Sequence, residues 1–150
     1  MHIGWSFLDT SQAAVRALTA YDKMQFIIDN TAADIEATRQ QMSSASSPAY
    51  DGLPHEHDPK AGENRMLSGI DKLDLLEARY QNALEYMQWF QPAWERLGDD
   101  DKFVLKTFFC GDGDAVSIVS EHFCIERTSA YSRRKRAVKR LAALLYGYKS

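Results

Sequence analysis

Residues 119–141 read VSEHFCIERTSAYSRRKRAVKRL and combine a short apolar segment, a turn and a strongly basic helix. The apolar residues on both sides of the turn are spaced to form a small core and one inner helix face. They are Val119, Phe123, Ile125 and Ala130, followed by Val138, Leu141 and Leu145. Ser120 supplies the small side chain that two crossing helices need. The pattern therefore predicts two helices joined by a tight turn at 124–126.

Two short helices are predicted before this turn. Asp99, Asp100 and Asp101 suit the N-terminus of an apolar helix that continues through Phe109, because carboxylates interact favourably with the positive end of the helix dipole. Asp114 is a candidate cap for the next helix.

Positive charge is concentrated at the C-terminal end of the chain. Residues 126–150 contain eight Lys or Arg and one acid, a net charge of +7. The whole chain has a net charge of −3, so residues 1–125 carry −10. Charge of one sign gathered on one helix is typical of a nucleic-acid contact. The alternative is that these side chains form an ordinary solvated face on an acidic protein.

The second helix of a helix-turn-helix places small polar and basic side chains in the major groove of DNA. The predicted helix, at about residues 127–145, offers two kinds of candidate contact. The base-edge candidates are Arg127, Thr128, Ser129, Ser132, Arg133 and Arg136. The candidates for phosphate contacts are Lys135, Lys139 and Arg140. Double-stranded DNA is therefore the expected partner.

Residues 99–145 resemble the last DNA-binding region of bacterial sigma factors. The best part is IERTSAYSRRKRAVKRL, residues 125–141, which looks like the family's Ile-Ser-x-Ser-x-Val-x-x-x-x-x-Arg-Ala-x-x-x-Leu. The matching positions are Ile125, Thr128, Ala130, Arg136, Ala137 and Leu141. Three positions depart from the family: Glu126 replaces Ser, Arg134 replaces an apolar residue, and Cys124 replaces the Gly of the turn. Cys124 would be strained if its φ angle is positive.

Two long helices are predicted in the first part of the chain. Residues 11–42 fit a heptad register, with Ser11 as a candidate N-cap. The two heptad positions hold Ala14, Tyr21, Ile28, Ile35 and Met42, and Ala17, Met24, Thr31 and Thr38. The second helix is predicted from about Asn64 to Phe90, with Pro92 ending or kinking it. Its apolar stripe is Met66, Ile70, Leu73, Leu76, Tyr80, Ala83, Met87 and Phe90.

Residues 43–63 contain three prolines and two glycines, which predicts a loop between the two long helices. Helices joined in this way fold back most simply as an antiparallel hairpin, here a coiled coil over residues 11–92. Neither apolar stripe is wide enough to be stable alone in water, so each is expected to pack against the other or against a second subunit. A homo-oligomer formed through the hairpin is therefore expected.

The order of the elements carries a second resemblance. A long N-terminal helix, the segment SPAYDGLP at residues 47–54, a coiled-coil helix and a sigma-like helix-turn-helix are together similar to phage and prophage regulators of the ArpU/RinA type. The resemblance covers about residues 11–145 and implies a role in late-gene transcription control. RNA polymerase is a further candidate partner, although no segment matches the promoter-melting regions of sigma factors.

Other classes of function find little support in the residues. No nucleophile–base pair, Gly-rich phosphate loop or pair of catalytic carboxylates is apparent, so neither an enzyme nor a cofactor is expected. Cys110 and Cys124 lie outside any CxxC motif and favour a reduced setting. His55, His57 and Asp58 are a candidate metal-binding group, but ordinary polar loop residues are the simpler interpretation. Without a signal peptide pattern or an apolar run of about 18–20 residues, a cytoplasmic location without membrane contact is expected.

The expected fold is all-α, with a helical hairpin over residues 11–92 and a small helix-turn-helix domain over residues 98–147. The expected function is sequence-specific DNA binding in transcription regulation. The alternative is a coiled-coil interaction or assembly protein whose basic tail binds an acidic partner. Salt-sensitive binding to duplex DNA distinguishes the two.

Overall fold

The structure is a computed structural model that describes residues 9–45 and 61–147. Every regular element in these residues is a helix and none is a strand, which confirms the all-α prediction. None of the helices in this part of the chain is both long and apolar enough to cross a bilayer. The chain forms two compact units, Lys23–Glu85 on the one hand and Met1–Asp22 with Tyr86–Ser150 on the other.

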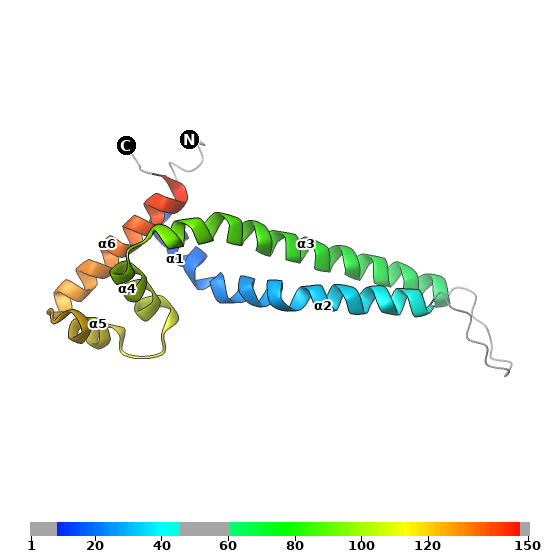
Figure 1. The fold of residues 1–150 in the computed structure, drawn as a ribbon, viewed down its shortest axis with the longest axis horizontal. Helices are drawn as coiled ribbons and strands as arrows, with labels where there is room; N and C mark the ends of the chain where they lie inside the picture. The colour runs from blue at the N-terminus through cyan, green and yellow to red at the C-terminus, as the bar shows by residue number, and fades with distance from the viewer. Residues whose placement is uncertain (1–8, 46–60, 148–150) are drawn as a thin grey trace. The chain divides into compact units, whose positions relative to one another are not determined.

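In the unit Lys23–Glu85, two long helices lie side by side and run in opposite directions (Figure 1). They belong to α2 (Tyr21–Ala45) and α3 (Ala61–Arg96). Their buried side chains are Ile27, Thr31, Thr38, Leu76 and Ala83. The two threonines occupy predicted heptad positions, and the Thr38 hydroxyl donates a hydrogen bond to the Asp34 carbonyl at 2.8 Å within its own helix. A polar residue is therefore accommodated in this seam without an unsatisfied group.

The start of α3 lies close to α2, but part of its predicted stripe is exposed. A Cβ atom on Gly69 would lie 2.6 Å from Met42 Cγ, so glycine permits the close approach of the two helices there. Met66 and Ile70, which belong to the predicted apolar stripe, are each 40% exposed. The exposed apolar side chains of this unit also include Phe26, Leu67 and Leu75.

The long first helix predicted for residues 11–42 is interrupted. α1 (Thr10–Thr19) ends at Thr19 with Ala20 as its C-cap, and α2 starts at Tyr21. α1 packs against α6 (Arg127–Tyr146) and α4 (Asp99–Cys110), so it belongs to the unit formed by the two ends of the chain. The range 11–92 predicted for the hairpin differs from this division. The physical reason is that Ala14, Ala17 and Leu18 are buried in the core of the other unit.

The N-terminus of α1 also differs from the prediction. Asp9, and not Ser11, is the N-cap, because its carboxylate accepts hydrogen bonds from the Ser11 and Gln12 amides at 3.1 and 3.2 Å. Ser11 lies inside the first turn. Its hydroxyl is therefore not needed to cap the helix.

The helix α3 extends beyond its predicted end at Phe90. It continues through Pro92 to Arg96, although proline cannot donate the backbone hydrogen bond of a regular helix. Phe90, Ala93 and Leu97 are buried in the core, which compensates for the missing hydrogen bond. Phe90 is fully buried, and the neighbouring Trp89 indole donates to the Leu145 carbonyl at 3.3 Å.

The C-terminal helices begin where their acidic residues predict. Asp99, Asp100 and Asp101 form the first turn of α4. Asp114 caps α5 (Ala115–Phe123) and accepts hydrogen bonds from the Ser117 amide and hydroxyl, at 3.4 and 2.7 Å. These helices share one apolar core with α1 and the end of α3. Its largest fully buried side chains are Phe90, Leu105, Leu141, Val104 and Val119.

Candidate nucleic-acid interface

The turn between α5 and α6 depends on Cys124, which adopts a left-handed conformation with φ 53° and ψ 49°. Its amide donates to the Glu121 carbonyl at 3.4 Å, and the Ile125 amide donates to the Ser120 carbonyl at 3.0 Å. These bonds end α5 and redirect the chain toward α6. The φ angle of Cys124 is thus positive, which costs roughly 1 kcal/mol for a residue with a side chain.

The residues predicted to pack around this turn are buried as expected. Val119 and Ala130 have no exposed surface, while Phe123 and Ile125 are half-buried against the same core. The Ser120 hydroxyl donates to the Val116 carbonyl at 2.6 Å. The predicted inner face of α6 is also buried, through Val138, Leu141 and Leu145. Together these contacts fix the rotation of α6 about its own axis.

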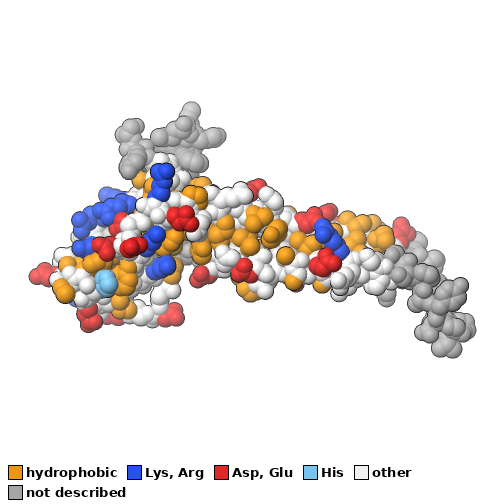
Figure 2. Space-filling model, viewed as in Figure 1, with side chains coloured by type: hydrophobic (Ala, Val, Ile, Leu, Met, Phe, Trp, Pro, Cys, Tyr) orange, Lys and Arg blue, Asp and Glu red, His pale blue; other side chains and the backbone are white. Residues whose placement is uncertain are grey.

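The opposite face of α6 presents five exposed polar residues in one row. A helix turns once every 3.6 residues, so side chains at these spacings project to the same side. We call this row the α6 stripe; it consists of Thr128, Ser132, Lys135, Arg136 and Lys139. Figure 2 shows Lys and Arg side chains gathered over α6. The stripe unites two hydroxyls and three cations, all of them predicted contact residues.

Two other arginines of α6 are held against aromatic rings. The guanidinium of Arg133 lies 4.1 Å from the centre of the Phe123 ring. That of Arg134 lies 5.3 Å from the Phe108 ring and 5.1 Å from the Tyr131 ring. Each such contact contributes about 0.5–1 kcal/mol at an exposed site. Arg134 therefore occupies a usually apolar position by placing its planar guanidinium over the Phe108 and Tyr131 rings. Ser129 is half-buried beside these residues.

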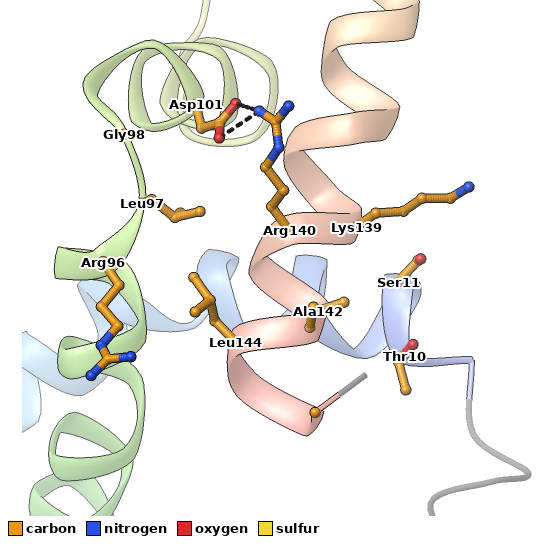
Figure 3. A pocket seen from close by; sticks show the side chains of 12 residues that line it. Thr10, Ser11, Arg96, Leu97, Gly98, Asp101, Lys139, Arg140, Ala142 and Leu144 are labelled. Atoms are coloured by element: carbon orange, nitrogen blue, oxygen red, sulfur yellow. Dashed lines mark hydrogen bonds and ion pairs between the residues drawn. The ribbon is translucent and has the colours of Figure 1, made fainter. Parts of the chain in front are cut away.

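Arg140 lies on the side of α6 that faces α4. Its Nη1 donates to both carboxylate oxygens of Asp101, at 2.7 and 2.8 Å (Figure 3). Asp99 and Asp100 line the same shallow groove as this ion pair. The charge of Arg140, a predicted phosphate contact, is therefore compensated by the start of α4.

Arg127 lies at the beginning of α6 and is exposed. Hydrogen bonds from Ser117, with a smaller contribution from the positive charge of Arg127, hold the pKa of the Asp114 carboxyl below its usual value. The preceding residue Glu126 is the N-cap, but its side chain makes no capping hydrogen bond. This end of α6 therefore has an exposed cation with an acidic neighbour.

Within the described ranges, 9–45 and 61–147, no three His, Cys, Asp or Glu side chains lie close enough together to hold a metal ion. The candidate group His55, His57 and Asp58 lies outside these ranges, as does the segment at residues 47–54. His122 is exposed and stacks on Phe103, with 4.1 Å between ring centres.

One residue beside the stripe was not predicted from the sequence. Ser11 of α1 lines the same groove as Lys135 and Lys139 of α6. Its place depends on the packing of the two ends of the chain, which local periodicity does not reveal. The spacing of Ala14 and Leu18 is the only local sign that α1 has a buried face. The same spacing fits one long helix, so it does not predict packing against α6.

No family model, curated protein sequence or solved structure matches this chain. Evidence for its function therefore comes from the residues of α6 and their surroundings.

Proposed function

We propose that the protein is a DNA-binding transcription regulator in which α5, the turn at Cys124 and α6 act as a helix-turn-helix. The observation that carries this proposal is the α6 stripe. Its three cations, Lys135, Arg136 and Lys139, form no ion pair with an acid among the described residues. Charges left uncompensated in this way are available to neutralise phosphates.

The dimensions of a helix favour the same function. A helix with its side chains is about 10–12 Å wide, close to the width of the major groove, about 12 Å. In helix-turn-helix docking, the N-terminal half of the second helix faces the base edges. Thr128 and Ser132 occupy that half of the stripe, so they are the proposed base contacts. Lys135 and Lys139 lie further along and are the proposed phosphate contacts.

Arg133, Arg134 and Arg140 have a different role in this proposal. They are already engaged with Phe123, with Phe108 and Tyr131, and with Asp101 respectively. We propose that all three support the position of α6, and that Arg133 and Arg140 contribute less to DNA binding than the stripe.

The proposed protein partners are a second copy of the chain and RNA polymerase. The exposed apolar side chains Phe26, Leu67 and Leu75 support pairing of two hairpins, since paired helix-turn-helix domains read most specific sites. The sequence resemblance supports a phage or prophage late-gene regulator, with RNA polymerase as a further partner. Replacing Leu67 by Glu is expected to convert a dimer to a monomer in light scattering. A wild-type monomer at tens of micromolar contradicts the pairing.

The same exposed apolar residues favour a second candidate function, that of an assembly protein whose basic helix binds an acidic protein. DNA titration separates the two functions. Fluorescence anisotropy of a labelled duplex, repeated at several salt concentrations, is expected to show binding that weakens steeply as salt rises, because phosphate contacts release counterions. No binding to duplex DNA at low salt rejects the proposed function and leaves the assembly role.

A further inference from the structure

A groove between α1 and α6 runs beside the α6 stripe. We call it the α1–α6 groove. It has a volume of about 410 Å³, and its polar lining comprises Ser11, Tyr131, Ser132, Arg134, Lys135 and Lys139. All lie within one compact unit. Only Ser11 belongs to α1, and the others belong to α6.

The lining of the groove is chemically suited to an anion. It includes two ammonium groups, one guanidinium and three hydroxyls, but no carboxylate. The guanidinium of Arg134 is held in place by the Phe108 and Tyr131 rings, which limits the entropy lost when it binds a ligand. The groove on the side of α6 that faces α4 differs, because Asp99, Asp100 and Asp101 line it together with Arg133 and Arg140. A phosphate is therefore attracted more strongly to the α1 side of α6 than to the α4 side.

The position of Ser11 is set by packing. Ala14 is fully buried in the core that also contains Val138 and Ala142, so the first turns of α1 are held against α6. In Figure 3 the Ser11 hydroxyl lies on the side of α1 that faces the Lys139 side chain. The Ser11 and Gln12 amides are not offered as phosphate ligands, since Asp9 already accepts a hydrogen bond from each of them.

We infer that the α1–α6 groove binds a phosphate of the DNA backbone, with Ser11 as a contact from outside the helix-turn-helix. One strand of the duplex then passes along the α1 side of α6. This inference rests on the proposed function and adds the N-terminal helix to the interface.

The test compares Ser11→Asp with Gln12→Asp. Both changes add one negative charge to the first turn of α1, where the helix dipole favours it, so neither is expected to unfold the protein. Gln12 is exposed and does not line the groove. A negative charge about 6 Å from a phosphate weakens binding about three-fold in water. We therefore expect Ser11→Asp to weaken binding to a labelled duplex by about three-fold or more relative to Gln12→Asp.

Adding a positive charge at Ser11 in place of a negative one provides a second measurement, which does not depend on loss of binding. Ser11→Lys is expected to steepen the dependence of log affinity on log salt by about 0.9, the value for one added phosphate contact, while Gln12→Lys leaves it nearly unchanged. If the wild type binds DNA but the Ser11 and Gln12 variants behave alike, the inference is overturned and the proposed function stands. If the wild type does not bind DNA at low salt, both are overturned.

Discussion

Replacing Asp101 by Asn is expected to weaken the fold and, at the same time, to strengthen DNA binding. Asp101 accepts two contacts from Arg140, at 2.7 and 2.8 Å, and lies in the first turn of α4. The ion pair contributes about 0.2–1 kcal/mol, since the Arg140 side chain is 58% exposed. A carboxylate at a helix N-terminus contributes about 0.3–1 kcal/mol. The free energy of unfolding should therefore fall by about 0.5–2 kcal/mol, measured by urea denaturation followed by circular dichroism.

The gain in DNA binding follows from the same contact. Without the Asp101 carboxylate, the Arg140 guanidinium is uncompensated and one negative charge is removed from that flank of α6. If the guanidinium then contacts one more phosphate, the slope of log affinity against log salt steepens by about 0.9. Fluorescence anisotropy with one duplex at several salt concentrations measures this slope.

Asp100→Asn is the matched control for this prediction. Asp100 is exposed in the same turn and carries the same charge, but it makes no ion pair with Arg140 in the described structure. Asp100→Asn also removes one charge that repels phosphates and interacts with the dipole of α4. It does not release Arg140. If the two variants have the same salt slope, Asp101 does not restrain Arg140 and the reasoning is refuted.

Three further predictions test the turn, the stripe and the core. Cys124→Gly should raise the free energy of unfolding by about 1 kcal/mol in urea denaturation, because glycine adopts the left-handed conformation without strain; an unchanged value would contradict the turn geometry. Ser132→Ala should change the sequence selected from a random duplex library with little effect on the salt slope, whereas Lys135→Ala with Lys139→Ala should weaken binding to all sequences and reduce the slope by up to about one per lost contact. Burial raises the pKa of Tyr86, whose hydroxyl donates to the Ala17 carbonyl in α1. The folded state therefore favours the neutral tyrosine. This contribution to stability is fully present below the pKa of tyrosine in the unfolded chain, about 10, and is lost as pH rises above that value. Tyr86→Phe should reduce this alkaline loss of stability, and an identical pH profile for the two proteins would count against it.

The features that were predictable from the sequence are local ones. The buried face of α6 follows from the spacing of Val138, Leu141 and Leu145, because helix periodicity relates each residue to its near neighbours. The turn at residues 124–126 was recognisable for the same reason, since one short motif contains all of its hydrogen bonds. The acidic start of α4 depends only on charge at a helix end.

The features that were missed depend on contacts between distant parts of the chain. A heptad pattern shows that Ala14 and Ala17 are on one face, but not which helix covers that face. The ion pair of Asp101 with Arg140 and the stacking of Arg134 on Phe108 likewise join different helices. From sequence, Arg140 looks like a free cation equivalent to Lys139, and Arg134 looks like a cation at a usually apolar position. Their engagement is visible only once α4 and α6 are packed together.

The packing of α1 with α6 determines when the chain can finish folding. Ala14, Ala17 and Leu18 of α1 are buried in a core that also needs Leu141 and Leu145, which are synthesised much later than α1. Closing so long a loop is not costly in itself, because each doubling of loop length adds only about 0.6 kcal/mol. The apolar side of α1, however, lacks its α6 partners until α6 has been synthesised. A fragment containing residues 98–147 alone would expose the complementary surface, so binding and folding measurements require the intact chain.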